Sequence, residues 1–281
     1  MNRQGDAIVT TRALVLGGGG PAGVAWATGL LAGLAEAGAD VTDADRLVGT
    51  SAGSVVAAQV ASGAALGELY ARQADPALQT REIASGVSVE ALMASWAESA
   101  ALEPTERRRF AGKVAVETET VSEAARREVV AARLPVHEWS TRDVVIVAVD
   151  VSDGEPVLFE RTSGVGLVDA VTASCAVPGV WPPVTIGDAR YMDGGMRSMC
   201  NADLAQGCDK VLIVAPLAAA DGDLEAQVEG LDGAVEVVGP DAASIAAIGP
   251  NPLDPTVRTP CAEAGRAQGL ALAAQIAAFW V

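Results

Sequence analysis

A serine lies at the centre of a run of small residues, GTSAG at 49–53, a pattern that can present a nucleophile. The run follows a short apolar segment at 45–49 and precedes small and apolar residues at 51–62 that predict a buried helix. A turn between strand and helix would project the Ser51 hydroxyl over a helix N-terminus, which favours developing negative charge. The small residues that flank it are Gly49 and Gly53. The alternative is that Ser51 only caps the helix.

Glycines also dominate an earlier loop, where residues 18–23 match G-x-G-x-x-G between a predicted strand at 12–16 and a predicted helix at 22–37. Backbone N–H groups in such a loop can hold a pyrophosphate or stabilise an oxyanion during acyl transfer. A dinucleotide site also requires an acidic residue at the end of the second strand, but Asp40 and Asp43 precede that strand. The oxyanion role is therefore favoured. Gly18 and Gly20 open the motif, and Gly23 completes it.

A third motif, Asp193-Gly194-Gly195, follows a short predicted strand. Asp-Gly-Gly taken alone is usually just a turn. The only histidine of the chain, His137, lies in an expected loop and is interpreted as a surface residue. A serine nucleophile would then need another base, and a buried, hydrogen-bonded Asp193 can take that role.

Composition excludes several other classes of protein. The 281 residues include 36 acidic and 19 basic side chains, a net charge of −17, which disfavours nucleic acids and general attraction to anionic membranes. The four cysteines have no CxxC spacing and predict reduced thiols in a cytoplasmic protein. With one histidine, neither a metal site nor a cofactor is expected. The uncharged stretch 13–35 is interpreted as strand, glycine turn and helix rather than a membrane span.

Strand and helix patterns alternate along the chain and predict a parallel sheet covered by helices on both faces. The strongest strand pattern is at 143–151, and residues 156–160 can pair back on it as a hairpin. The other expected elements are a helix at 166–175, strands at 210–216 and 234–240, and a helix at 261–280.

Residues 64–135 show no strong strand pattern and predict a helical insertion that caps the sheet. A stripe at helical spacing is expected to face the sheet or a pocket, and it comprises Val89, Leu92, Met93 and Trp96, with Ser88 as N-cap. A second amphipathic helix is expected at 121–134. Seven basic and six acidic residues between 103 and 133 are typical of a solvated helix face, and the alternative is a surface that meets lipid phosphates.

The three motifs in this order resemble the patatin-like phospholipase family. The resemblance extends over roughly residues 12–216 and includes DAVTASCAVPGVWPP at 169–183. It implies a three-layer α/β/α sandwich with a mostly parallel central sheet and a helical cap. It also implies a catalytic dyad, in which Ser51 is the nucleophile and Asp193 the base.

The same resemblance extends to the surroundings of the dyad. It implies an oxyanion hole from the amides of Gly18, Gly19 and Gly20, and a site lined near Ala176-Val177-Pro178. The remaining motif glycines are Gly23, Gly49, Gly53, Gly194 and Gly195. One position departs from the family pattern, because Ala22 stands where members often have Arg or Lys. The missing basic side chain can alter the preference for a charged head group.

The expected function is therefore hydrolysis of lipid or other carboxylic esters through an acyl-Ser51 intermediate, by a single domain, residues 1–281, with the cap at 64–135. The expected partner is the ester substrate, with transient contact to a membrane or micelle. Two alternatives stay open. An acyltransferase would share the acyl-enzyme, and a nucleotide-binding or regulatory protein would use the first glycine loop without turnover.

Overall fold

The sheet at the centre of the molecule has eight strands, and five of them run parallel. The computed structural model describes residues 10–84, 87, 92, 94, 99, 101–218 and 222–281. The parallel strands are β1 (Arg12–Leu16), β2 (Arg46–Thr50), β3 (Asp143–Asp150), β7 (Lys210–Val214) and β8 (Ala234–Val238). They lie in the order β3-β2-β1-β7-β8, and each confirms a strand expected from an apolar run. The shorter strands β4 (Pro156–Phe159), β5 (Val184–Ile186) and β6 (Ala189–Asp193) pair antiparallel.

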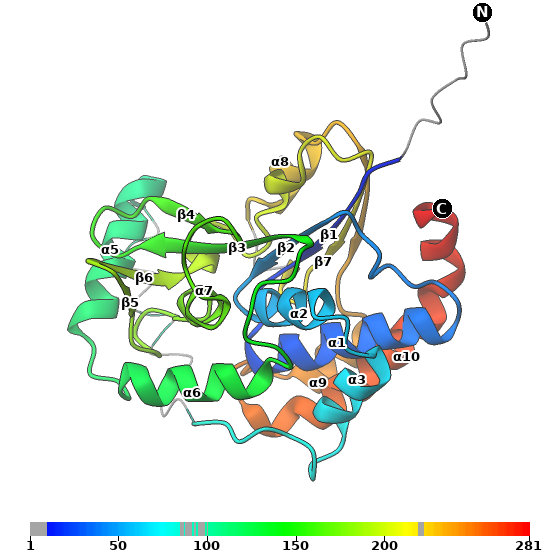
Figure 1. Ribbon diagram of the computed structural model, residues 1–281, viewed down its shortest axis with the longest axis horizontal. Coiled ribbons are helices and arrows are strands. Elements are labelled where there is room, and N and C mark those ends of the chain that lie inside the picture. The colour runs from blue at the N-terminus through cyan, green and yellow to red at the C-terminus, as the bar shows by residue number, and fades with distance from the viewer. Residues whose placement is uncertain are drawn as a thin grey trace, which may run out of the picture.

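Helices cover both faces of this sheet, as expected for a three-layer α/β/α sandwich (Figure 1). One face packs against α1 (Gly20–Glu36), α2 (Ala52–Ala61), α3 (Leu66–Ala74), α7 (Leu167–Ser174), α9 (Ala242–Ile248) and α10 (Arg258–Trp280). The opposite face packs against α8 (Leu224–Glu229) and a 3-10 helix at Ala202–Ala205. Side chains alternate between the faces, since Leu14 and Leu16 join the first core and Ala13 and Val15 the second.

The helical segment expected at 64–135 divides into two parts. Its first helix, α3, packs against α1 and α10 and so belongs to the layer beneath the sheet. Of its later helices, α5 (Pro104–Glu117) lies beside β4, β5 and β6 at one side of the molecule (Figure 1). The next helix, α6 (Glu123–Arg133), packs against α7. Leu92 is buried, as expected, against Val180 and Trp181. The rest of the predicted stripe, with its N-cap, lies outside the described residues: Ser88, Val89, Met93 and Trp96.

Several details differ from the expectations. Helix α1 begins at Gly20 rather than residue 22, because Gly20 adopts a positive φ of 59° that lets the chain enter the helix directly from the loop. The β5–β6 hairpin, which turns at Gly187, was only partly expected, and α8 and α9 were not. Among the described residues, no helix combines the length and the apolar character that crossing a membrane requires.

Small residues allow α1 and α10 to pack backbone against backbone. A Cβ on Gly29 or Gly33 would meet the carbonyl groups of Ala262 or Arg266 on α10. A Cβ on Gly265 or Gly269 of α10 would likewise meet carbonyl groups of α1. The spacing of four residues places both glycines of each helix on one face. This contact anchors the C-terminal helix to the helix that follows the first glycine loop.

We predict that Gly265→Ala destabilises the protein by about 1–3 kcal/mol, because the new methyl group meets the backbone of Trp26, which cannot move aside cheaply. Gly67→Ala is the control, since Gly67 is exposed in α3 with open space around its Cβ position. That change should stabilise the helix by roughly 1 kcal/mol. Urea unfolding of the two variants measures both values, and a neutral Gly265→Ala would contradict the close helix contact.

Candidate active site

The ends of β2 and β6 meet on one edge of β3. Residues 146–149 of β3 pair with β4 along the other edge. On the shared edge, β2 pairs in parallel up to Thr50 opposite Val147, and β6 pairs antiparallel down to Asp193 opposite Ala148. The two strands therefore run toward each other and stop at neighbouring register positions. This arrangement brings the first residue after β2, Ser51, beside the last residue of β6.

Ser51 occupies a sharp turn between β2 and α2, as the GTSAG pattern predicts. Its φ is +51°, one of two positive values among the described residues other than glycine, the other being that of Asn201. Such a conformation is strained for a residue with a side chain and persists only when its surroundings enforce it. A Cβ at Gly53 would collide with the Leu16 carbonyl, and one at Gly49 would lie 2.6 Å from Ser54 Cα. Both flanking glycines are thus required by the packing.

Three neighbouring side chains hold the peptide groups of this turn. The Ser51 N–H donates to Ser174 Oγ at 2.9 Å, and Ser174 ends α7 in the segment of 169–183. The Ser51 carbonyl accepts hydrogen bonds from Ser54 Oγ at 2.6 Å and from Cys175 Sγ at 3.2 Å. The adjacent pair Ser174-Cys175 therefore binds the nucleophile turn on both sides. Sequence reasoning placed this segment near the site but did not identify these contacts.

Asp193 is buried, with 2% of its surface exposed, beneath the same turn. Its Oδ1 accepts a hydrogen bond from the Gly195 N–H at 2.7 Å. Its Oδ2 is buried and accepts no hydrogen bond from the described residues. Burial raises the pKa of Asp193 to about 7, although the Ser51 side chain, the Gly195 N–H and the positive charge of Arg126 each act to lower that pKa. The Ser51 side chain is thus close enough to act on the carboxyl group.

Asn201 joins the two loops that carry Ser51 and Asp193. Its Nδ2 donates to Thr50 Oγ1 at 2.9 Å and also reaches the Gly194 carbonyl at 3.4 Å. Arg197 donates to Asn201 Oδ1 at 2.6 Å and so fixes the orientation of the amide. Asn201 is fully buried and has a φ of +53°. The sequence carried no signal for this role, because Thr50 lies 151 positions away from Asn201 along the chain.

The first glycine loop lies directly against Ser51. A Cβ on Gly18 would lie 3.6 Å from Ser51 Cβ. The Gly18 N–H, however, donates to the Met199 carbonyl at 2.8 Å and is not free to bind a ligand. The N–H groups of Gly19 and Gly20 donate no hydrogen bond to any described residue. The available donors of the loop are therefore two rather than the three expected.

Ser51, Asp193 and the glycine loop line one small pocket of about 90 Å³. Its remaining wall is almost entirely apolar and consists of Leu92, Val177, Met196, Met199, Leu217, Pro252 and Leu253. Val177 comes from the segment expected to line the site. The other wall residues except Leu92 were not predicted, because they come from loops after β6, β7 and α9. A nucleophilic group, a buried carboxyl group and free backbone donors thus face a common apolar cavity.

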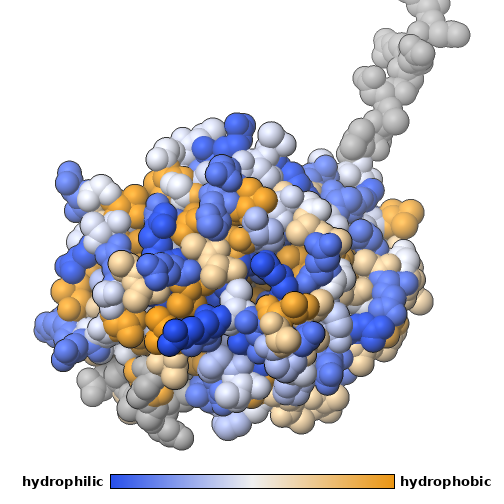
Figure 2. Space-filling view, turned by 60° about the horizontal axis from the view of Figure 1, so that its bottom comes forward, coloured by the Kyte–Doolittle hydropathy of each residue, from blue (hydrophilic) through white to orange (hydrophobic). Residues whose placement is uncertain are grey.

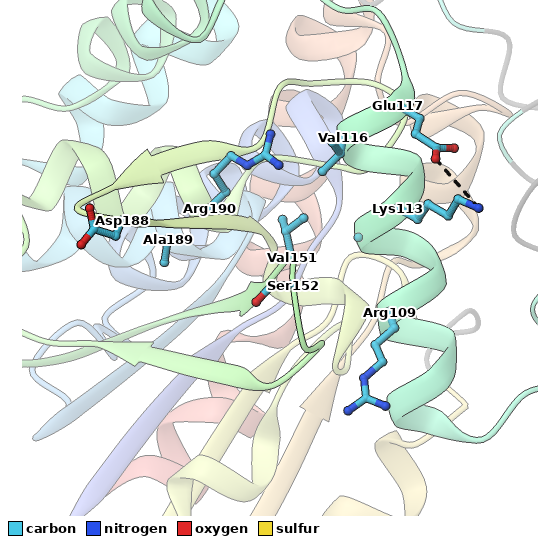
Figure 3. A pocket seen from close by; sticks show the side chains of 10 residues that line it. Arg109, Lys113, Val116, Glu117, Val151, Ser152, Asp188, Ala189 and Arg190 are labelled. Carbon is cyan, nitrogen blue, oxygen red and sulfur yellow. Dashed lines mark ion pairs between the residues drawn. The ribbon is translucent and has the colours of Figure 1, made fainter.

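A larger cleft of about 490 Å³ lies between α5 and the β5–β6 hairpin. Figure 3 shows Arg109 and Val116 of α5 and Arg190 of β6 around it. None of the predicted site residues lines this cleft. His137 is exposed, as expected, and its Nε2 donates a hydrogen bond to the Ala131 carbonyl at 3.0 Å. The described residues include no cluster of His, Cys, Asp and Glu side chains suited to a metal ion.

The fold is an α/β sandwich with a serine at a strand–helix turn and a buried aspartate beside it. The sequence matches the model of the family described as patatin-like phospholipase over residues 14–205, which is more than half of the chain. The chain therefore belongs to the patatin-like phospholipase family, a family of lipid hydrolases.

Solved structures similar to this chain include two bacterial proteins. VipD from Legionella pneumophila is 12% identical with a TM-score of 0.47, and the match covers 95% of this chain and 67% of that one. The type III effector protein ExoU is 16% identical with a TM-score of 0.45, and the match covers 95% of this chain but only 54% of ExoU. No curated protein matches the sequence.

We predict that Asp193→Asn stabilises the protein at pH 8. A carboxyl group whose pKa is raised from 3.8 to about 7 on folding binds more protons in the folded state, so its ionisation lowers stability as pH rises between these values. The gain of the neutral variant should be largest above pH 7, roughly 1–4 kcal/mol at about 1.4 kcal/mol per pKa unit, and should vanish near pH 4. Urea unfolding from pH 4 to 8 measures it, and a pH-independent difference would contradict the raised pKa.

We also predict that Ser174→Ala destabilises the protein by about 1–3 kcal/mol, because the buried Ser51 N–H loses its acceptor. Thr172→Val is the matched control on the same helix. The Thr172 hydroxyl only donates to the Val168 carbonyl four residues earlier, so its loss should cost less than about 1 kcal/mol. Equal losses in the two variants would mean that Ser174 has no special role at the turn.

Proposed function

We propose that the protein is a serine lipid acyl hydrolase that works through an acyl-Ser51 intermediate. Ser51 Oγ attacks the ester carbonyl while the Asp193 carboxylate accepts the hydroxyl proton. Asp193 then returns the proton to the leaving alcohol. Water, deprotonated by Asp193, attacks the acyl-Ser51 ester. The bond between the acyl group and Ser51 Oγ then breaks, Asp193 returns the proton to Ser51 Oγ, and the carboxylic acid is released.

The observation that carries this proposal is the meeting of Ser51 and Asp193 at the facing ends of β2 and β6. An aspartate is a weak base in water, with a usual pKa near 3.9. Burial raises the pKa of Asp193 to about 7, which lies close to the value at which a group both accepts and returns a proton efficiently. The fully formed Gly195 hydrogen bond at Oδ1 leaves the buried Oδ2 to receive the serine proton.

The tetrahedral oxyanion is proposed to bind the N–H groups of Gly19 and Gly20. These are the loop donors without acceptors in the described chain, and they line the pocket with Ser51. Helix α2 begins directly after Ser51, and its N-terminus adds a favourable field for developing negative charge. The bound Gly18 N–H fixes the loop rather than contacting substrate.

The substrate class is proposed to be a lipid or another ester with an apolar acyl chain. The pocket wall is apolar, and its volume of about 90 Å³ is below the roughly 300–1,000 Å³ of cavities that enclose whole ligands, so it suits the reacting end of a chain. Figure 2, which turns the lower side of Figure 1 forward, shows hydrophobic residues interspersed with hydrophilic ones. This mixed surface supports transient contact with a lipid aggregate.

The proposed location is the cytoplasm. All four cysteines are free thiols, three of them buried, which supports a reducing compartment.

We predict that Ser51→Ala removes nearly all hydrolysis of a short-chain aryl ester, and that Asp193→Asn lowers the rate by about 10²–10⁴-fold. The double variant should be hardly slower than Ser51→Ala, because both residues act in one step. The kcat/KM of the parent should rise with pH through a midpoint near 7, as the base ionises. A fluorophosphonate should label Ser51 in the parent and fail to label the Ser51→Ala variant.

His137→Ala is the control for this series, because His137 is exposed and lines neither the pocket nor the glycine loop. Its rate should stay within a few-fold of the parent rate. Full activity of Asp193→Asn, or collapse of activity in His137→Ala, would refute the serine–aspartate mechanism.

A further inference from the structure

The buried charged residues of the described chain gather in one place. Among the described residues, three charged ones are buried as whole residues, backbone included. They are Arg126, Arg133 and Asp193, with 3%, 9% and 2% of their surface exposed. Charged residues are rarely buried without a partner, because leaving water is costly. Their common location at the candidate site therefore calls for an explanation beyond folding.

Glu82 binds both arginines. Its side chain is 4% exposed, accepts from Arg126 at 2.7 Å, and forms a second ion pair with Arg133. One carboxylate between two guanidinium groups leaves a buried excess of one positive charge. Burial lowers the pKa of Arg126 to about 10, so the guanidinium remains charged at neutral pH. The excess charge becomes neutral only if another buried anion lies nearby.

Arg126 and Asp193 approach the same turn, Arg126 through Trp181 and Asp193 through its backbone N–H. The Arg126 guanidinium lies 3.9 Å from the centre of the Trp181 ring. The Trp181 N–H donates to the Val177 carbonyl at 2.9 Å, and the carbonyl of the preceding residue, Ala176, accepts the Asp193 N–H at 3.0 Å. Trp181 also packs with Leu92, and Leu92 lines the pocket. The arginine thus lies behind the pocket wall and outside contact with substrate.

We propose that Arg126, held by Glu82 and stacked on Trp181, is a positioning residue that supplies the buried counter-charge of the Asp193 carboxylate. The four most deeply buried charges, two arginines and two carboxylates, then sum to zero when Asp193 is ionised and to plus one when it is protonated. The half-buried Arg258 adds one further positive charge beside Arg133. In a medium of low dielectric constant this difference favours the ionised base. Removal of Arg126 raises the proton affinity of Asp193, and removal of the Glu82 charge lowers it.

The other groups that face Asp193 do not explain this balance. The Ser51 hydroxyl and the Gly195 N–H are neutral donors. The Cys175 thiol, adjacent to α7, stays protonated, because burial raises its pKa and the Asp193 charge raises it further. Arg126 is therefore the cation that acts on Asp193.

The kinetic test rests on the proposed function and compares pH profiles of kcat/KM. Arg126→Met should move the acid limb upward by about one pH unit, and Glu82→Gln should move it downward, while Arg126→Lys should restore most of the parent value. Arg127→Met is the matched control, because Arg127 lies next in α6 but pairs with Asp169 at the surface, where its side chain is 48% exposed. It should leave the limb unchanged.

A second measurement does not require turnover. Carbon-13 NMR titration of the Asp193 carboxyl group in a Ser51→Ala background should show the same opposite shifts. If they occur in a protein without hydrolase activity, the proposed function fails and the inference stands. If Arg126→Met does not fold, the opposite shift in Glu82→Gln and the parent-like value in Arg126→Lys still test it. Shifts of one sign in both charge-removing variants, or no shift beyond that of Arg127→Met, would overturn it.

Discussion

The site depends on one geometric constraint, the register with which β2 and β6 share an edge of β3. β2 ends opposite Val147 and β6 ends opposite Ala148, which is the next residue of β3. Ser51 and the Asp193 carboxyl group are therefore neighbours in space. A shift of either strand by one residue would turn the terminal side chain to the other face of the sheet. Gly194 shows how closely the chain turns away from this edge, since a Cβ there would meet the Val147 carbonyl.

This geometry has energetic consequences that the surrounding structure must offset. Ser51 is held at a positive φ, and the Asp193 carboxyl group is buried in a site where its charged form is disfavoured. The turn is held by a hydrogen bond to Ser174 and by hydrogen bonds from Ser54 and Cys175, and the large apolar core around the sheet supplies the stability. Burial of the Asp193 carboxyl group thus lowers the stability of the fold wherever the pH favours its ionised form.

The sequence predicted those features that local pattern determines. The strand, turn and helix around Ser51 follow from GTSAG and its apolar flanks, and the parallel strands follow from short buried runs. Asp193 was predicted from one motif and from the shortage of histidine. The roles of Ser174 and Asn201 were not predictable, because they arise from contacts across 123 and 151 residues. The hydrogen bond from the Gly18 N–H to the Met199 carbonyl was not predictable for the same reason, because it also joins residues far apart in the sequence.

The sign of the net charge differs between the whole chain and its buried ionic group. The chain as a whole has a net charge of −17, yet the buried ionic group formed by Glu82, Arg126 and Arg133 is positive. Surface charges lie in water and are screened within about 10 Å, so the acidic exterior acts weakly on Asp193. A buried cation is screened far less and therefore has a larger influence on the Asp193 carboxyl group. An acidic composition is thus compatible with a buried carboxylate, because the buried charges nearest to Asp193 are not the charges that dominate the net charge of the chain.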